Sequence, residues 1–128
     1  MVVDDTYVDR YIAERNIRKY DFAEEIIFKD SAKNALDYLE EFSNKPDELP
    51  QIIFLDVRMP EMDGFGFLEE FAKLSESIKT KCNIVMLSTS INPNDTELAR
   101  ANKYVSQILI KPLDLATINS IKVKNSLL

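Results

Sequence analysis

Four short apolar segments of the chain are each followed at once by side chains that could do phosphoryl chemistry. These side chains are Asp4 and Asp5, Asp56, Ser88 and Thr89, and Lys111. Carboxylates gathered within a few ångströms repel one another, so their pocket either raises a pKa or binds a hard divalent cation, for which Mg²⁺ is the natural candidate. A carboxylate beside that cation can attack phosphorus, while Lys111 and Ser88 neutralise and hydrogen-bond the phosphoryl oxygens. The residue types therefore predict an aspartyl-phosphate site, provided that the fold brings them together.

Composition excludes several other classes of site and partner. The 128 residues contain no His, which rules out Ser-His-Asp and Cys-His catalysis and imidazole metal sites. The single Cys82 cannot form an internal disulfide. A net charge of −6 argues against binding to nucleic acid or anionic lipid. Because no segment is apolar over the ~20 residues of a membrane span and there is no basic-apolar leader, we expect a cytoplasmic protein without a membrane partner.

Apolar runs alternate with amphipathic helical patterns along the whole chain. Strands are predicted at residues 2–3, 25–28, 52–55, 84–87 and 108–110, and helices at about 6–20, 31–42, 64–74, 95–103 and 114–123. Thr6 and Asp9 resemble the N-cap and capping box of the first helix. Strands joined by helices pair in parallel, so the sequence predicts an α/β fold with a doubly wound five-stranded parallel sheet and five helices. We expect one domain over residues 1–128.

The predicted sheet determines where the reactive side chains meet. In a doubly wound sheet, ligands bind beyond the carboxyl ends of the strands, and the acidic, hydroxyl and lysine side chains named above all follow strands. Any one of them alone would be an ordinary turn or cap residue. Their joint placement at one edge of the sheet favours a functional pocket instead.

One segment also resembles a known family. Residues 53–64 read IFLDVRMPEMDG and are similar to the strand-three signature around the phosphoacceptor of response regulator receiver domains. The resemblance covers residues 2–123 and implies a flavodoxin-like receiver fold in a two-component system. It implies that Asp56 accepts a phosphoryl group, with Mg²⁺, from a histidine kinase or phosphotransfer protein. Phosphorylation would alter the affinity for a downstream protein target, and the chain would be no enzyme beyond its own phosphorylation and dephosphorylation.

The resemblance also implies a set of metal ligands. Asp4 and Asp5 match the acidic pair that holds Mg²⁺ directly or through water. Asp56 and the backbone carbonyl of Arg58 would complete the protein ligands. Gly64, one of only two glycines, suggests that the loop before it needs a positive φ or a close backbone approach.

The residues around the phosphoryl group follow from the same resemblance. Ser88 matches the family's Ser/Thr that bonds the phosphoryl group, and Lys111 matches its lysine. Pro112 would follow a cis peptide bond, as is usual in the family. The family often places an aromatic residue three positions before the lysine, where this sequence has Ile108.

Other functions compete with the switch. A phosphatase with an aspartyl nucleophile would place its general acid two residues after the nucleophile, and that position is Arg58. A degenerate receiver-like interaction module usually lacks the lysine or an acidic residue, whereas this chain has all of them. Nucleotide-binding motifs of the G-x-x-x-x-G-K-[ST] and G-x-G-x-x-G types are absent. Because only residues 124–128 follow the last predicted helix, we expect a stand-alone receiver or phosphorelay intermediate without an output domain.

Overall fold

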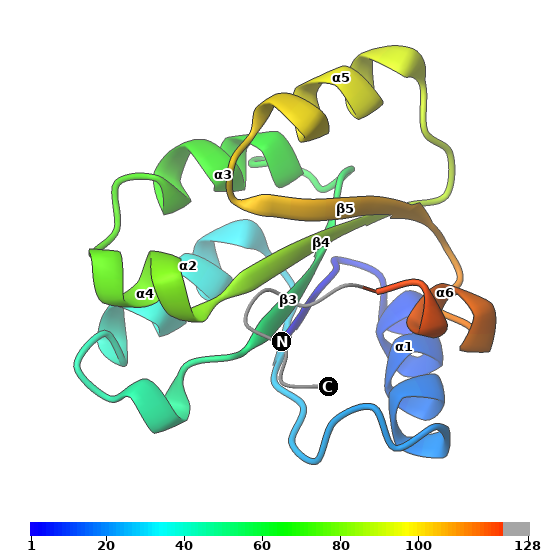
Figure 1. The fold of residues 1–128 in the computed structure, drawn as a ribbon, viewed down its shortest axis with the longest axis horizontal. Helices are drawn as coiled ribbons and strands as arrows, with labels where there is room; N and C mark the ends of the chain where they lie inside the picture. The colour runs from blue at the N-terminus through cyan, green and yellow to red at the C-terminus, as the bar shows by residue number, and fades with distance from the viewer. Residues whose placement is uncertain (122–128) are drawn as a thin grey trace.

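The sheet of the computed structural model, which describes residues 1–121, has five parallel strands in the order β2-β1-β3-β4-β5 (Figure 1). The strands are β1 (Val2–Val3), β2 (Phe28–Lys29), β3 (Ile52–Asp56), β4 (Asn83–Ser88) and β5 (Val105–Ile110). The central strands β3 and β4 are almost wholly buried, as expected of continuous apolar runs covered on both faces. The predicted doubly wound parallel sheet is therefore confirmed.

Six α-helices and one short 3₁₀ helix occur within residues 1–121. They are α1 (Tyr7–Lys19), α2 (Ala32–Glu41), the 3₁₀ helix η1 (Pro46–Glu48), α3 (Gly64–Phe71), α4 (Glu76–Lys81), α5 (Pro93–Ala101) and α6 (Leu115–Asn119). The prediction of five helices was wrong, because it missed α4. That helix has a single buried apolar residue, Ile78, so its sequence offers no apolar period to detect.

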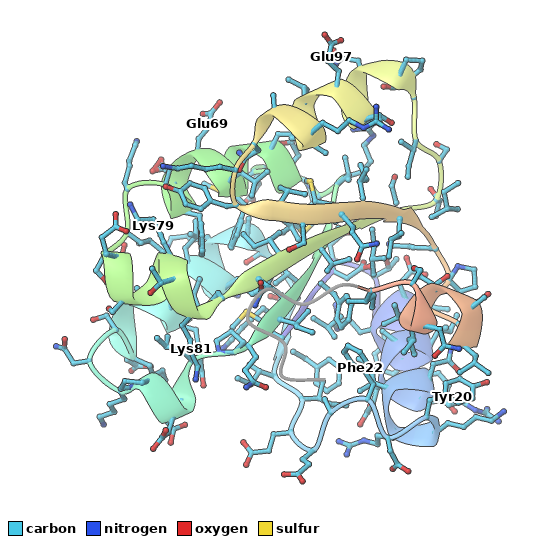
Figure 2. All side chains as sticks on the ribbon, in the orientation of Figure 1. Tyr20, Phe22, Glu69, Lys79, Lys81 and Glu97 are labelled. Atoms are coloured by element: carbon cyan, nitrogen blue, oxygen red, sulfur yellow. The ribbon has the colours of Figure 1, made fainter. Side chains whose placement is uncertain are left out.

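Two apolar clusters hold the helices against the sheet. Helices α1 and α6 cover one face, where Ala13, Ile17 and Ile118 pack with strand residues such as Phe54. Helices α2 to α5 contribute to the cluster on the other face. Polar side chains such as Glu69 and Glu97 project outward from α3 and α5 (Figure 2). This arrangement leaves the carboxyl edge of the sheet to the loops.

Several predicted boundaries shift in the structure. The sequence predicts β2 at residues 25–28, but only Phe28 and Lys29 pair with β1, at the sheet margin. The last helix was predicted over residues 114–123. The structure has α6 at Leu115–Asn119, with the Asp114 side chain accepting from the Thr117 backbone N–H, and residues 122 and 123 lie outside the described range.

The loop between β3 and α3 brings backbone segments into close contact. A Cβ atom on Gly64 would lie 2.7 Å from the Asp56 carbonyl oxygen and 2.9 Å from Met86 Cε. Gly64 is therefore needed for a close backbone approach, while the positive φ in this loop belongs to Glu61, at 68°. Asp63 caps α3 by accepting from the Gly66 backbone N–H at 2.8 Å.

Within residues 1–121, none of the helices combines the length and apolar character that crossing a membrane requires.

Candidate functional site

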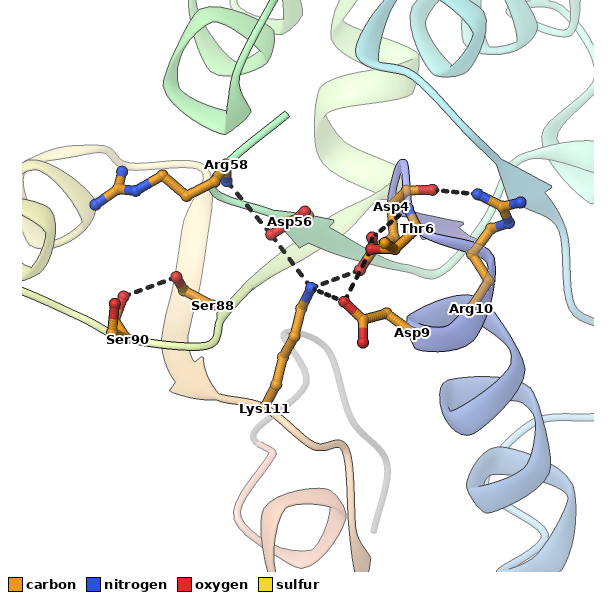
Figure 3. Close-up of polar contacts among 9 residues, drawn as sticks. All are labelled: Asp4, Thr6, Asp9, Arg10, Asp56, Arg58, Ser88, Ser90 and Lys111. Atoms are coloured by element: carbon orange, nitrogen blue, oxygen red, sulfur yellow. Dashed lines mark hydrogen bonds and ion pairs between the residues drawn. The ribbon is translucent and has the colours of Figure 1, made fainter. Parts of the chain in front are cut away.

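Strand register brings the predicted site residues to one edge of the sheet. Val3 pairs with Leu55, Asp56 with Leu87, and Ser88 with Ile110. Asp4, Asp56, Ser88 and Lys111 therefore emerge side by side at the carboxyl ends of β1, β3, β4 and β5 (Figure 3).

The acidic side chains form the group best suited to hold a cation. Asp4, Asp5 and Asp56 each offer one carboxylate oxygen, and these oxygens lie within 4.8 Å of one another. Asp4 and Asp56 are buried, with exposed fractions of 4% and 6%, whereas Asp5 is exposed. An all-oxygen set that opens to solvent on one side fits Mg²⁺, which prefers a few carboxylates and retains water ligands. The cluster therefore suits the cation that the resemblance implies.

Burial makes Asp56 unusual among these acids. Burial first, and the Asp4 carboxylate second, raise the pKa of Asp56 to about 6, although Lys111 and the Arg58 backbone N–H act in the opposite direction. The Arg58 N–H lies 3.3 Å from Asp56 Oδ1. Burial and the neighbouring Asp4 carboxylate both disfavour the charged form of Asp56, so a bound divalent cation would offset them and keep Asp56 ionised at neutral pH.

The Lys111 ammonium lies among three carboxylates. Its Nζ is 2.7 Å from Asp4 Oδ2, 2.9 Å from Asp9 Oδ2 and 3.4 Å from Asp56 Oδ1 (Figure 3). Burial lowers the pKa of Lys111, but the hydrogen bonds to Asp4 and Asp9 outweigh it, so the pKa lies above its ordinary value. Lys111 is therefore a fixed positive charge next to Asp56. The peptide bond between Lys111 and Pro112 is cis, as predicted.

The Ser88 hydroxyl is engaged by its own loop. Ser88 is 1% exposed, and its Oγ donates a 2.7 Å hydrogen bond to the Ser90 carbonyl. Figure 3 shows this bond on the side of the site away from Asp4. Ser88 lies at the predicted edge, but its hydroxyl proton would have to leave Ser90 in order to bond a group on Asp56.

Arg58 connects the site to α5 through its side chain. Its guanidinium lies 2.6 Å from Asp95 Oδ2, and Asp95 is only 3% exposed at its side chain. The Asp95 carboxylate also accepts from the Asn92 backbone N–H, and the Asn92 side chain accepts from the Asp95 backbone N–H. These two hydrogen bonds form a full capping box. This pairing could not be predicted from the sequence, because the two residues are 37 positions apart.

Asp9 is the site residue that the sequence reasoning misassigned. The Thr6 side chain makes no capping bond to the backbone of α1, so the predicted capping box is wrong. The Thr6 hydroxyl instead lies 2.7 Å from Asp4 Oδ1 and 3.0 Å from Asp9 Oδ2. The Lys111 hydrogen bond is the main cause that lowers the pKa of Asp9. The only feature of the sequence that could have assigned Asp9 to the site is its spacing, one helical turn after the acidic pair.

A cavity of about 340 Å³ adjoins these charged groups. Its polar lining comes from Asp4, Asp9, Asp56, Thr89 and Lys111, and the rest is formed by apolar residues of the sheet, α1 and the loop before α6. Asp56 is therefore accessible from a recess whose only positive lining charge, among the described residues, is Lys111.

Comparison with known proteins agrees with this geometry. The profile of the response regulator receiver domain family matches residues 1–121. The chain is 32% identical over 113 residues to the probable methanogenesis regulatory protein FilR2 of Methanothrix harundinacea, covering 88% of this chain and 71% of that protein. It is 34% identical over 125 residues to the two-component response regulator ORR26 of Oryza sativa, covering 94% of this chain but only 19% of that protein.

Solved structures give the same result. A two-component response regulator from Cytophaga hutchinsonii has a TM-score of 0.85 at 28% identity, covering 92% of this chain and 88% of that one. A response regulator receiver protein from Dyadobacter fermentans has a TM-score of 0.79 at 31% identity, covering 90% and 87%. Receiver domains are signalling modules of two-component systems that are generally not enzymes and that typically bind Mg²⁺ at an acidic pocket. With its fold, its acidic pocket and a family match over residues 1–121, this chain belongs to the response regulator receiver domain family.

Proposed function

We propose that the chain is a phosphorylatable switch in which Asp56 accepts a phosphoryl group from a histidine kinase or phosphotransfer protein. The observation that carries this proposal is the convergence on buried Asp56 of an acidic pair and one partly buried ammonium. The Asp56 carboxylate oxygen would form a bond to phosphorus as the bond from phosphorus to the donor's histidine nitrogen breaks. The electron pair of that bond leaves with the imidazole, which must come from the donor because this chain has no His.

Each remaining residue has a defined part in that transfer. Asp4, Asp5, Asp56 and the Arg58 backbone carbonyl would hold Mg²⁺, which supplies charge neutralisation at the phosphoryl oxygens. Lys111 would neutralise another phosphoryl oxygen, and its position 3.4 Å from Asp56 supports this assignment.

Acetyl phosphate and Mg²⁺ provide the direct test, read by intact mass. We expect one added phosphate on the wild-type chain and none on Asp56→Asn or in excess chelator. Asp47→Asn is the matched control, because Asp47 is an exposed aspartate of η1, which precedes the amino-terminal end of β3, and its removal changes the net charge equally. If Asp56→Asn gains phosphate like the control, the phosphoacceptor is another residue. If the wild-type chain gains none, the chain is a receiver-like interaction module instead.

Lys111 and Ser88 should respond differently to removal. Loss of a transition-state donor slows transfer by roughly 10²- to 10³-fold, which is our expectation for Lys111→Ala. Ser88→Ala should phosphorylate nearly normally, because its hydroxyl bonds Ser90 in this structure, and should instead weaken the conformational response. Normal phosphorylation and normal phosphate retention in Lys111→Ala would leave Lys111 with a structural role only.

The proposed output is a change in affinity for a downstream protein through the surface of α5, β5 and α6. Ser88 precedes the loop to α5, and Lys111 precedes α6, so drawing both side chains toward Asp56 would shift the starts of those helices. Their backbones are already coupled, since the Lys111 N–H donates to the Ser88 carbonyl at 2.8 Å. Amide exchange with and without beryllofluoride and Mg²⁺ should change over residues 88–95, and changes confined to the pocket would contradict this route.

The phosphatase alternative loses support in the structure. The position that would carry a general acid holds Arg58, whose guanidinium is paired with buried Asp95. A guanidinium stays protonated at all accessible pH values and cannot donate a proton to a leaving group.

A further inference from the structure

Lys111 makes two short hydrogen bonds before any phosphoryl group arrives. Its Nζ lies 2.7 Å from Asp4 Oδ2 and 2.9 Å from Asp9 Oδ2, and its ion pair with Asp56 Oδ1 is longer, at 3.4 Å. A close contact with a phosphoryl oxygen on Asp56 would therefore draw the ammonium away from one of its two hydrogen-bond partners. The partner that Lys111 leaves determines how strongly the unphosphorylated protein resists phosphorylation.

Asp4 and Asp56 both belong to the cluster that could hold a cation, and Asp9 does not. A cation would draw charge from Asp4 and Asp56 and weaken their attraction for the ammonium. Asp9 would keep its full charge for Lys111. It would then be the strongest remaining competitor of the phosphoryl group for that ammonium.

Local structure holds Asp9 in this competing position. Asp9 lies in the first turn of α1, and its Oδ2 also accepts from the Thr6 hydroxyl at 3.0 Å. The helix N-terminus and the adjacent ammonium both favour the ionised carboxylate. Its side chain is 31% exposed, against 11% for Lys111, so the contact is partly screened and can be broken.

We propose that Asp9 is a positioning residue that restrains Lys111 in the unphosphorylated protein and must release it for phosphoryl transfer. This inference rests on the proposed function, because it assigns a direction to the movement of Lys111 toward a phosphoryl group on Asp56. The restraint opposes formation of the phosphorylated state. It has little effect on the phosphoryl lifetime, because the transition state for hydrolysis and the phosphorylated state both have Lys111 already displaced from Asp9.

Asp9→Asn tests the restraint with minimal change in shape. The asparagine keeps the size of the side chain but removes the charge that attracts the ammonium. Partly exposed ion pairs contribute up to about 1 kcal/mol, so we expect phosphorylation by acetyl phosphate and Mg²⁺ to become about fivefold faster. The half-life of the phosphorylated form after removal of the donor should change by less than about twofold.

Two control variants separate this effect from general electrostatics. Glu14→Gln changes the net charge equally on the same helix, but Glu14 forms its ion pair with Arg18 rather than with Lys111. It should phosphorylate at the wild-type rate. Asp9→Glu restores the charge and should return the rate toward that of the wild type.

A second measurement needs neither metal nor phosphate. In chelator, ¹⁵N NMR of the lysine ammonium groups should show Lys111 protons that exchange slowly with water in the wild-type chain, because the ammonium is hydrogen-bonded to Asp4 and Asp9. Asp9→Asn should accelerate that exchange, whereas Glu14→Gln should not. Lys111→Arg identifies the signal by its disappearance.

The outcomes distinguish failure of this inference from failure of the proposed function. Faster phosphorylation in Asp9→Asn alone, with an unchanged half-life, supports the restraint. A wild-type chain that gains phosphate while Asp9→Asn is equal or slower, or while its Lys111 exchange is unchanged, overturns the restraint and leaves the switch intact. A wild-type chain that gains no phosphate overturns both.

Discussion

Replacing Asp56 by Asn should stabilise the unphosphorylated, metal-free protein at neutral pH. Asp56 is ionised there although it is 6% exposed and lies beside the Asp4 carboxylate. Burial and this neighbour raise its pKa from 3.8 to about 6, so the folded state binds a proton more readily than the unfolded chain does. Between about pH 4 and pH 6 the folded protein therefore loses stability as the pH rises, and above pH 6 the full cost remains.

The size of the effect follows from the two pKa values. At 1.36 kcal/mol for each pKa unit, the cost of ionising Asp56 in the fold is about 3 kcal/mol at pH 7.5. At pH 4.5 most Asp56 side chains are protonated in the folded state, and the same two values leave a cost of about 1 kcal/mol. Asn resembles the protonated acid, so Asp56→Asn should recover about 3 kcal/mol at pH 7.5 and about 1 kcal/mol at pH 4.5.

Urea unfolding in chelator at the two pH values measures both differences. Asp47→Asn again serves as the control, since Asp47 is exposed and its substitution should leave the free energy of unfolding within about 0.5 kcal/mol of the wild type. An Asp56→Asn gain that is absent, or equal at both pH values, would refute the reasoning. The result would mean that solvent or Lys111 compensates the buried charge fully.

Three further changes have expected outcomes. Gly64→Ala should destabilise the fold by about 1–3 kcal/mol in urea unfolding, because the alanine Cβ would lie 2.7 Å from the Asp56 carbonyl oxygen. An undiminished free energy of unfolding would mean that the loop relaxes at no cost. Asn92→Ala should lower the free energy of unfolding by about 1 kcal/mol in the same measurement, since it removes the cap that accepts from the Asp95 N–H. Asn92→Asp should keep most of the free energy of unfolding that Asn92→Ala loses. Mg²⁺ should raise the melting temperature of the wild-type protein, because the metal would bind the acidic cluster of the folded state. It should raise the melting temperature of Asp5→Asn less, and equal shifts in the two proteins would place the cation elsewhere.

The sequence was most informative where chemistry follows directly on a buried strand. Asp56 and Ser88 could be placed at one edge because each ends a continuous apolar run, and parallel strands end together. The same reasoning placed Lys111 after β5. These predictions depend on strand direction and hardly on exact boundaries, so the shift of β2 to Phe28–Lys29 did not disturb them.

Contacts between side chains from separate elements could not be predicted from the sequence. Asp9 fitted a local capping pattern equally well. Only the packing of α1 against the segment after β5, where Asn16 donates to the Leu113 carbonyl, shows that Asp9 pairs with Lys111, 102 positions away. Arg58 and Asp95 are likewise joined by tertiary structure alone. Helix α4 was missed for a different reason, since one buried apolar residue in six gives no periodicity.

Arg58 offers a connection from Asp56 to α5 that does not need an aromatic residue at position 108. Its backbone N–H lies 3.3 Å from Asp56 Oδ1, and its guanidinium reaches Asp95, which belongs to the capping box at the start of α5. The loop that follows Ser88 leads to the same helix end, so α5 is linked to the site along two routes. Ile108 is half-buried against the core and offers no polar group to either route. A group that displaced Asp56 Oδ1 from the Arg58 N–H would therefore move Arg58, whose side chain pairs with Asp95 at the start of α5. The Arg58 side chain is half exposed, which leaves it room to move with its backbone.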